Sequence, residues 1–303
     1  MANVYTSAMG MISFQNKLDV VGNNIANQKS NGYKKDHETF RVFEEGVQKM
    51  IEGNRQKTIG DYEEEVHSDN VQTNYDPGLL KVTNRNLDLA LEDKTDLNGD
   101  SNVSFFEVEI SGEKMLTRDG HFEIDEENNL TLLNGAYVLD TNGKHIKVPK
   151  GENVSVDSLG NIKSSETGRL LGSIQIRSIA QENTGYLKKT YGNMFQVMSL
   201  DEIQKNFGNV NEILRVFDDN PSLQKILKNK QVLQEAASTG QLNIFDGGGG
   251  KALVHSQTLE QSNVDITTEM NEMLLAQKGY QANAKALSTM DKINEKEANQ
   301  IGV

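Results

Sequence analysis

One acidic loop in this 303-residue sequence has the residue types and spacing of a calcium-binding loop. Between Asp96 and Glu107, oxygen-bearing side chains fall at loop positions 1, 3, 5, 9 and 12. Position 6 is Ser101 where such loops carry glycine, and a strand pattern rather than a helix pattern follows. Two interpretations stay open: a calcium site formed by Asp96, Asn98, Asp100 and Glu107, or a hairpin turn rich in Asp and Asn.

No other group of residues predicts catalysis or a cofactor. The five histidines are scattered without an HExxH pair, and a GxSxG motif is absent. The glycine run before Lys251 lacks two positions of a phosphate-binding loop, where Phe245 and Ala252 stand instead of Gly and Ser/Thr. We therefore expect no catalytic residue, no cofactor and no enzymatic activity.

Composition and charge exclude further classes of function. The chain has 44 Asp and Glu against 31 Lys and Arg, and its net charge of -13 repels nucleic-acid phosphates. It has no cysteine, which excludes disulfides and thiol chemistry. No apolar run approaches the ~20 residues of a membrane span, and the first residues lack the pattern of a secretory signal. The sequence predicts neither nucleic-acid binding nor membrane insertion.

The two ends of the chain carry similar heptad patterns, and each predicts an amphipathic helix. The first helix is expected to end at Asn31-Gly32, and the last to begin near Ser262-Asn263. The predicted seam comprises Val4, Ala8, Met11, Gln15, Leu18, Gly22 and Ile25 near the N-terminus, and Ile266, Met270, Met273, Gln277, Tyr280, Ala284, Leu287 and Asp291 near the C-terminus.

These helices either pack separately on a core or pair with each other as an antiparallel coiled coil. Charge favours pairing. Residues 1–35 hold four Lys against one Asp, or +3, and residues 264–303 hold four Lys against six acids, or -2. Antiparallel pairing would bring Gln15 and Gln277 within hydrogen-bonding distance and define the register.

Three asparagines extend this interpretation. With the seam above, Asn23, Asn24 and Asn27 lie on the face away from the partner helix. Asparagine is a poor helix former, so three on one face lower helix stability, and no interaction within the helix is expected to compensate for this loss. We expect this face to contact further copies of the chain, and a head-to-tail contact that does not close produces a helical filament.

Between the ends the period of the pattern changes, which predicts an α+β fold. Residues 71–198 alternate with a period of two and contain Asp-Gly and Asn-Gly turns, as antiparallel strands do. Residues 199–245 return to helical spacing and predict a helical insertion. Residues 34–70 are expected to be a connecting segment, and residues 246–257 a Gly-rich linker.

Several motifs identify a family resemblance. The N-terminal motif is Asn23-Asn24-Ile25-Ala26-Asn27 followed by Gly32-Tyr33-Lys34. The C-terminal motif runs from Leu259-Glu260-Gln261-Ser262-Asn263-Val264 through Glu269-Met270 to Ala276-Gln277-Lys278-Gly279-Tyr280-Gln281-Ala282-Asn283. The middle adds Asn86 to Leu91, Leu116 to Phe122 and Asn134 to Leu139. With these motifs the chain resembles the flagellar rod and hook protein family, the axial proteins of the bacterial basal body.

The resemblance implies a structural rod subunit exported by the flagellar type III apparatus. Residues 1–33 and 258–303 would form an inner coiled-coil assembly domain, and residues 71–198 an outer β domain. Implied partners are other copies of the chain, other rod and hook proteins and the export apparatus, and the implied location is the basal body outside the cytoplasmic membrane. A single β domain favours a rod subunit over the alternative of a hook-type subunit. The competing interpretation is a secreted calcium-binding β module whose end helices cap its core.

Two stretches depart from the family pattern. Asp93 to Asn102 is an additional loop that leads into the strand at Phe105-Phe106. The helical insertion of residues 200–245 stands where the family has a short connector. This insertion is expected to mark a specialised rod subunit or an added contact to a neighbouring structure.

Overall fold

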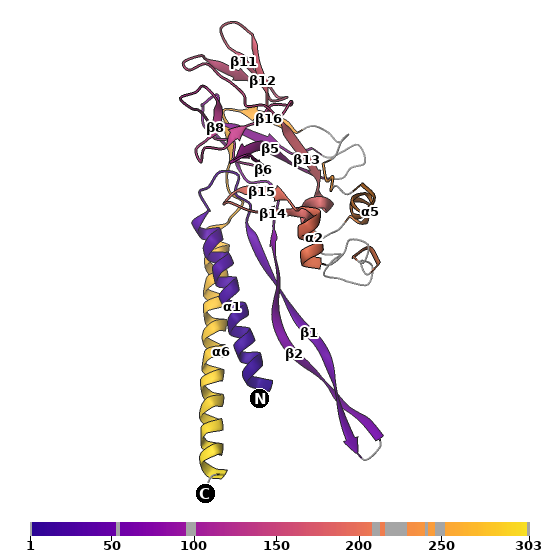
Figure 1. The fold of residues 1–303 in the computed structure, drawn as a ribbon. Helices are drawn as coiled ribbons and strands as arrows, with labels where there is room; N and C mark the ends of the chain where they lie inside the picture. The colour runs from indigo at the N-terminus through magenta and orange to yellow at the C-terminus, as the bar shows by residue number, and fades with distance from the viewer. Residues whose placement is uncertain are drawn as a thin grey trace. The chain divides into compact units, whose positions relative to one another are not determined.

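The computed structural model describes residues 2–52, 55–94, 101–207, 213–215, 229–239, 242–245 and 252–301. It has a long helix at each end and antiparallel strands between them (Figure 1), which confirms the predicted α+β class. The chain divides into two compact units. The terminal unit comprises Met1–Gln28, Lys34–Asp76 and Val264–Val303, and the β unit comprises Lys29–Tyr33 and Pro77–Asn263.

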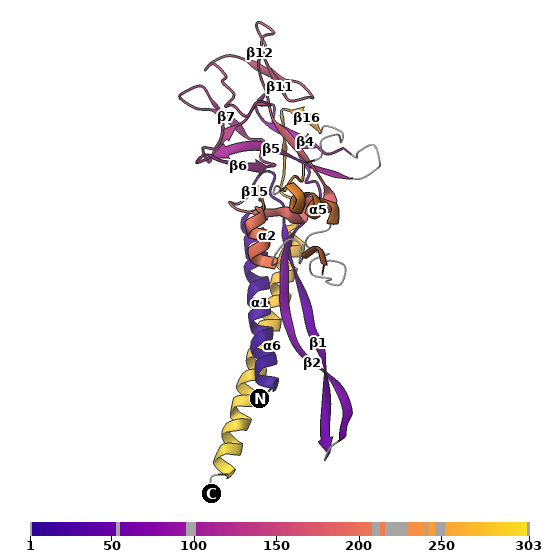
Figure 2. The same ribbon diagram turned by 45° about the vertical axis from the view of Figure 1, so that its right-hand side comes forward.

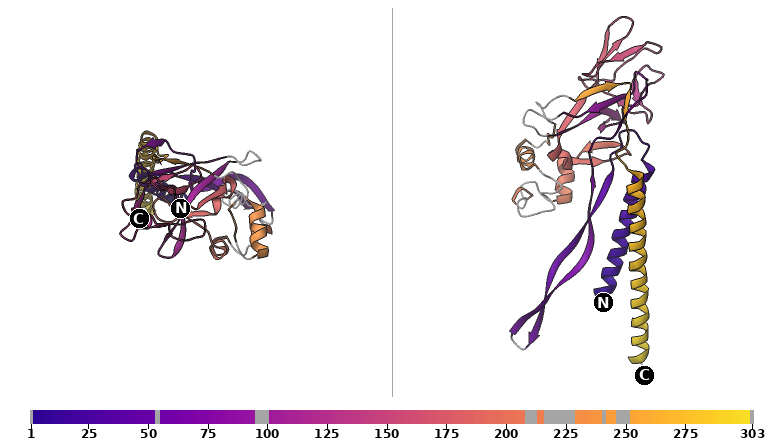
Figure 3. Two further views of the ribbon diagram at one scale, coloured as in Figure 1. Left: turned by 90° about the horizontal axis from the view of Figure 1, so that it is seen from above. Right: turned by 180° about the vertical axis from the view of Figure 1, so that it is seen from behind.

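The terminal unit consists of two helices and one long hairpin. Helix α1 (Ala2–Ala26) lies alongside helix α6 (Ile266–Ile301) in opposite directions, and the last turns of α6 extend beyond the start of α1 (Figures 1 and 3). Strands β1 (Asp36–Glu52) and β2 (Arg55–Thr73) form a twisted antiparallel hairpin (Figure 2). The stretch expected to be a connecting segment is therefore mostly a hairpin that belongs with the terminal helices.

The β unit contains the remaining strands and the short helices. The strands are β3 (Leu80–Val82), β4 (Leu89–Glu92), β5 (Asn102–Ile110), β6 (Glu113–Thr117), β7 (Phe122–Ile124), β8 (Leu130–Leu132), β9 (Tyr137–Val138), β10 (Val154–Val156), β11 (Asn161–Ser164), β12 (Leu170–Ser173), β13 (Ile176–Ala180), β14 (Leu187–Lys189), β15 (Met194–Val197), β16 (Leu253–Ser256) and β17 (Thr258–Glu260). The helices are the 3₁₀ helix η1 (Gln181–Tyr186), α2 (Leu200–Phe207) and α5 (Lys230–Thr239).

The largest sheet is built around β5. Its strand order is β14-β15-β6-β5-β9-β8-β7, and β13 pairs with the first half of β5, on the edge whose other half pairs with β9. The family motif from Leu116 to Phe122 extends from the end of β6 to the start of β7, and the chain leaves the strand between them at residues 118–121. Smaller sheets are β10-β11-β12, β16-β4 and β17-β3.

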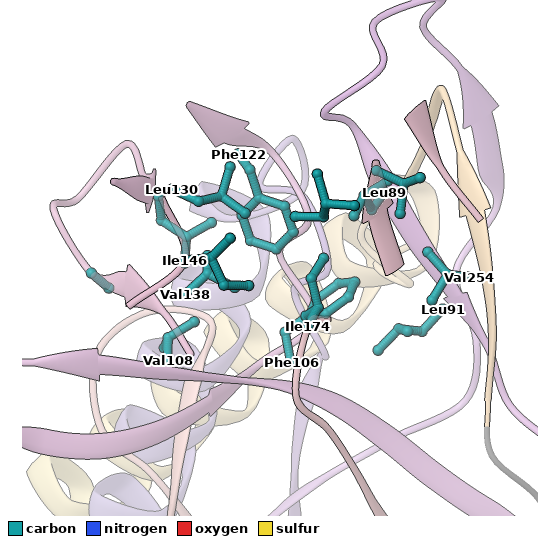
Figure 4. Packing of buried hydrophobic residues seen from close by; sticks show 14 of the residues in the cluster. Leu89, Leu91, Phe106, Val108, Phe122, Leu130, Val138, Ile146, Ile174 and Val254 are labelled. Atoms are coloured by element: carbon teal, nitrogen blue, oxygen red, sulfur yellow. The ribbon is translucent and has the colours of Figure 1, made fainter. Parts of the chain in front are cut away.

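The hydrophobic core of the β unit lies between β5 and the strands that pair or pack around it. Phe106 and Phe122 meet edge to face, with ring centroids 5.1 Å apart. Val108, Val138 and Ile146 fill the space beside them (Figure 4). Phe106 and Val108, two residues apart on β5, enter this cluster, as the period of two in a strand requires. The other face of β5 is covered as well, since residues 102–108 are all buried.

The C-terminal part of the β unit differs from the expected linker. Residues 253–256 form β16, which pairs with β4, and Val254 is buried in the core cluster (Figure 4). The glycine run at residues 247–250 lies outside the described residues. Helices α2 and α5 confirm helical structure in the predicted insertion, where Ile203, Leu233 and Ala236 are buried.

Candidate functional site

The two terminal helices contact each other through a close approach at two glycines. A Cβ atom at Gly279 would lie 2.4 Å from Cζ of Phe14, so the missing side chain on α6 makes room for the ring on α1. A Cβ atom at Gly10 would lie 2.8 Å from Nδ2 of Asn283. Glycine inside a helix is destabilising by roughly 0.5–1 kcal/mol relative to alanine. Close packing against the partner helix offsets that loss.

Polar side chains extend the contact toward the C-terminal end of α1. Lys17 forms an ion pair with Glu272. Asn24 is 1% exposed, and its Nδ2 donates to Oε2 of Glu269 at 3.1 Å and to the carbonyl oxygen of Asp36 at 2.6 Å. Its Oδ1 accepts a hydrogen bond from the backbone N–H of Asp36 at 3.0 Å. One buried amide therefore joins α1, α6 and the start of β1.

The first turn of α6 is capped by Asp265. Its Oδ2 accepts a hydrogen bond from Oγ1 of Thr268 at 2.6 Å, and its Oδ1 accepts one from the N–H of Thr267 at 3.0 Å. These hydrogen bonds lower the pKa of Asp265. The N-cap of α6 is therefore Asp265, because both of its carboxylate oxygens accept hydrogen bonds from the first turn. The helix begins after the predicted Ser262-Asn263.

The contact face on each helix lies one residue before the predicted seam. On α1 it includes Gly10, Phe14, Lys17 and Asn24. Gln15 is exposed and donates to Asp19 on its own helix at 3.1 Å, and Gln277 is also exposed. The expected Gln15–Gln277 hydrogen bond is therefore wrong. The helices approach each other more closely on the face that contains glycines than they could on the predicted apolar face. Close packing therefore decides the register.

The asparagine prediction is corrected in the same way. Asn24 faces α6 instead of pointing away from it. Asn23 is exposed, and Nδ2 of Asn27 donates to its Oδ1 at 2.9 Å. The shift of the contact face by one residue moves Asn24 into the helix interface, while Asn23 and Asn27 bond to each other at the end of α1.

The other predicted seam and motif residues of the terminal unit differ in burial. Those that are half-buried are Ala8, Met11, Leu18, Ile25, Val264, Met273, Tyr280, Asn283, Ala284 and Leu287. Those that are exposed are Ala26, Ile266 and Met270. The side chain of Val4 lies outside the described part of the chain.

The remaining motif residues lie in the β unit, where the N-terminal and C-terminal motifs meet again. Helix α1 ends at Ala26, before the predicted end at Asn31-Gly32. Gly32 nevertheless has the predicted positive φ, +63°, and its N–H donates to the carbonyl oxygen of Glu260 at 2.8 Å. Tyr33 is 1% exposed, and its carbonyl oxygen accepts a hydrogen bond from the N–H of Asn263 at 3.3 Å. Nζ of Lys189 lies 3.8 Å from the centroid of the Tyr33 ring. Ser262 is half-buried.

A buried ionic cluster lies beside this meeting point. The side chain of Arg118 is fully buried and donates from Nε to Oε2 of Glu260 at 2.8 Å. It also donates from Nη1 and Nη2 to the two carboxylate oxygens of Asp93, at 2.8 and 3.0 Å, and from Nη1 to the carbonyl oxygen of Ser104 at 2.7 Å. Burial opposes the charged form, but Glu260 and Asp93 outweigh it and raise the pKa of Arg118.

Sequence reasoning missed the residues that make these contacts most specific. Gly10 and Phe14 were not included in the seam, although a glycine inside a helical pattern often has a packing reason. Glu269 was quoted in a motif without a role, and its contact with Asn24 joins two segments far apart in the chain. The sequence does not indicate that Arg118 and Glu260 are in contact, because only the tertiary fold brings the end of β6 close to β17.

The calcium hypothesis finds no support among the described residues. Asp96, Asn98 and Asp100 lie outside them. Glu107 is buried in β5, where Oε2 accepts a hydrogen bond from Nε of Arg177 at 2.7 Å and Oε1 lies 3.6 Å from Nζ of Lys114. In the part of the chain that the structure describes, no group of three or more potential ligands could hold a metal ion.

Comparison with known proteins matches both ends and the middle of the chain. Residues 4–34 match the model "Flagella basal body rod protein", residues 98–184 match "Flagellar hook protein FlgE/F/G D1 domain", and residues 255–301 match "Flagellar basal body rod FlgEFG protein C-terminal". At both ends and in the middle, the chain is similar to flagellar rod and hook proteins. This confirms the resemblance found in the motifs.

Full-length relatives of this family match almost the whole chain. Flagellar basal-body rod protein FlgG of Bacillus subtilis is 28% identical over 302 residues, which cover 96% of each chain. Flagellar hook-basal body complex protein FlhO of the same organism is 26% identical, covering 99% of this chain and 98% of its own. Flagellar basal-body rod protein FlgF of Buchnera aphidicola is 27% identical, covering 98% and 96%.

The matched segments coincide with the contacts described above. The first and third family models include Asn24 and Glu269 of the terminal unit, and Gly32 and Glu260 of the β unit. Among the helices that the structure describes, none is long and apolar enough to cross a membrane. The segments matched by the first and third family models, residues 4–34 and 255–301, therefore contain the contacts described between α1 and α6.

Proposed function

We propose that the chain is a structural subunit of the bacterial flagellar basal-body rod that polymerises through its terminal helices. The matches to the family models and the names of the relatives support this function. The observation that carries the assembly step is an apolar stripe on α6, formed by Ile266, Met270 and Leu274, which are 38%, 55% and 55% exposed.

This stripe does not face α1 in the single chain. Its residues are spaced four apart and lie on one side of α6, which points away from the side that holds Gly279. Large apolar side chains in a row on a helix mark a surface that another chain covers. Two residues of the predicted seam, Ile266 and Met270, thus acquire a role between subunits.

The unequal lengths of the helices support contacts along the axis. Helix α6 has 36 residues and α1 has 25, so the last turns of α6 have no counterpart on α1 (Figure 3). Ile293 in these turns is 50% exposed. A head-to-tail contact with the next copy would cover this end and would generate an open helical assembly.

The finer parts of the function follow from this assembly. The antiparallel α1–α6 pair acts as a coiled coil in the inner part of the rod, and the β unit forms its outer part. Partners are further copies of the chain and other axial proteins of the rod and hook. The chain is exported by the flagellar type III apparatus to the basal body, outside the cytoplasmic membrane, and acts without enzymatic activity.

Polymerisation of the purified chain tests the assembly surface. Charge introduced by Met270→Glu and Leu274→Glu should prevent polymers, measured by sedimentation and electron microscopy, while the monomer keeps its helical circular dichroism signal. Leu170→Glu is the matched control, because Leu170 is 54% exposed in the β unit and should not affect polymers. Polymers that form equally well from the Met270→Glu, Leu274→Glu chain would refute the assembly surface.

Imaging of basal bodies tests the cellular role. Deletion of the gene should produce basal bodies in which the rod stops short and cells without motility. Complementation with the wild-type chain should restore both, and complementation with Met270→Glu, Leu274→Glu should not. A complete rod in the deletion strain would refute the role as a rod subunit.

A further inference from the structure

Glu260 holds together all three parts of the chain that connect the β unit to the terminal unit. The chain passes between the units after Gln28, after Tyr33, after Asp76 and after Asn263. Residues 29–33, the stretch that begins at Pro77 and the stretch that ends at Asn263 therefore lead to these passages. All three lie within the β unit. The last of them contains Glu260, and each of the other two makes a hydrogen bond to Glu260 or to the residue next to it.

The hydrogen bonds of Glu260 reach the other two connecting stretches and one side chain of the β unit. Its carbonyl oxygen accepts from the N–H of Gly32 at 2.8 Å. Its Oε1 accepts from the N–H of Gly78 at 2.9 Å, and its Oε2 accepts from Nε of Arg118 at 2.8 Å. The N–H of the next residue, Gln261, donates to the carbonyl oxygen of Leu79 at 2.8 Å.

Two glycines allow the backbones to approach this closely. A Cβ atom at Gly32 would lie 2.4 Å from the carbonyl carbon of Arg118, and a Cβ atom at Gly78 would lie 1.9 Å from the carbonyl oxygen of Gln261. Any side chain at either position would force the backbones apart. The bidentate contact of Arg118 with Asp93 then anchors Glu260 to the rest of the β unit.

We propose that Glu260 and Arg118 are positioning residues. They hold the segment that follows α1 close to the segment that precedes α6 before the two helices pair. This inference rests on the proposed function, because pairing of α1 with α6 is the step that it prepares. Asn24 and Glu269 are separated by 245 residues in the chain. Once Gly32 and Glu260 are joined, only a few residues on each side separate the junction from the helices.

The shorter connection changes the probability of pairing. Loop-closure probability falls roughly as the −3/2 power of the length of the connecting chain. Replacing a loop of 245 residues with one of about 12 raises the effective concentration of one helix near the other on the order of 100-fold. The folded β unit thereby makes pairing nearly local for segments at opposite ends of the sequence.

The chain offers a clean way to measure this in the full-length protein. It has no cysteine, so Lys29→Cys with Gln261→Cys provides two unique sites for spin labels on exposed residues of the β unit. Gly279→Val, which drives a side chain into the ring of Phe14, separates the helices. The distance between the labels should stay short and narrowly distributed in the Gly279→Val chain, because the junction at Glu260 is intact.

Gly32→Val breaks the junction and has a matched control. Added to Gly279→Val, it should broaden and lengthen the label distance. Gly112→Val is the control, because Gly112 also has a positive φ, +83°, but a Cβ atom there meets nothing within 4 Å. The control should leave the distance unchanged, and circular dichroism should report a folded β unit in every variant.

A kinetic readout separates positioning from stability alone. In the chain with an intact helix interface, Gly32→Val should slow re-pairing of α1 and α6 on the order of 10-fold after a jump from mild denaturant, because the pairing of β3 with β17 still limits the connecting loop to roughly 60 residues. Gly112→Val should not slow it. Labels that separate with Gly279→Val alone, or pairing rates equal in the two variants, would overturn the proposal. Both readouts use the monomer, so a failure of polymerisation would count against the proposed function and leave this result interpretable.

Discussion

Asn24 and Glu269 lie 245 residues apart in the chain, yet Nδ2 of Asn24 donates to Oε2 of Glu269 at 3.1 Å inside the terminal unit. The same amide makes two hydrogen bonds with the backbone of Asp36. A single side chain therefore fixes where α6 and the start of the hairpin lie along α1. Its neighbour Asn23 is exposed, so of these two asparagines only Asn24 is buried in the contact with α6.

Asn24→Asp should destabilise the helix pair by about 2–4 kcal/mol at neutral pH, because it places a second carboxylate against buried Glu269 and removes a donor. Urea unfolding and amide exchange on α1 measure the loss. Asn23→Asp adds the same charge one residue away and should change stability by less than about 1 kcal/mol.

The chain also offers a rescue of this variant. Glu269→Gln in the Asn24→Asp background restores a donor and removes the repulsion, so it should recover at least half of the lost stability. Equal losses for Asn24→Asp and Asn23→Asp would show that Asn24 is not the residue that aligns the helices.

Gly279→Val should weaken the helix pair by roughly 2–3 kcal/mol, because a side chain there overlaps the ring of Phe14. Exchange protection of α1 and α6 reports the change. Gly22→Ala is the matched glycine substitution, since a Cβ atom at Gly22 meets nothing within 4 Å. It should stabilise α1 by about 0.5–1 kcal/mol, and a destabilising Gly22→Ala would contradict the contact face assigned here.

Arg118→Met should destabilise the β unit by about 3–5 kcal/mol, because Glu260 and Asp93 lose their shared counter-ion while Glu260 stays buried. Thermal unfolding followed by circular dichroism measures this. Combining Arg118→Met with Glu260→Gln and Asp93→Asn removes the uncompensated charges and should restore much of the stability. Arg169→Met at an exposed position should be nearly neutral. A triple variant less stable than Arg118→Met would argue against a charge effect.

The stability of the β unit should depend on pH through Asp157. Partial burial of this carboxylate is outweighed by hydrogen bonds from the side chain and N–H of Asn161 and from Lys163, which lower its pKa to about 2. The unfolded value is about 3.9, so the stabilisation is present above pH ~4 and is lost as the pH falls toward 2.

Asp157→Asn should therefore cost about 1 kcal/mol at pH 7, reduced by solvent screening of this partly exposed group, and almost nothing near pH 2. Urea unfolding at both pH values measures the difference. Glu166→Gln, at an exposed residue in the next turn, between β11 and β12, should change stability by less than about 0.5 kcal/mol at pH 7. A loss for Asp157→Asn that is the same at both pH values would contradict the assigned hydrogen bonds.

Local patterns in the sequence were enough to predict the kinds of elements and their order. The heptads predicted α1 and α6, the period of two predicted the strands around β5, and Asn31-Gly32 predicted the left-handed residue that follows α1. Each of these depends on residues close together in the chain. The family motifs were readable for the same reason, because they are short and contiguous.

Tertiary structure alone decided the register of the helix pair and the partners of the buried polar groups. Periodicity defines an apolar face only to within about one residue. The fit of Phe14 against Gly279 and the three hydrogen bonds of Asn24 select the actual contact face. Arg118 and Glu260 are 142 residues apart, and the sequence around either residue does not predict that the two are in contact. Close packing and buried hydrogen bonds depend on distances in space, which a one-dimensional pattern does not contain.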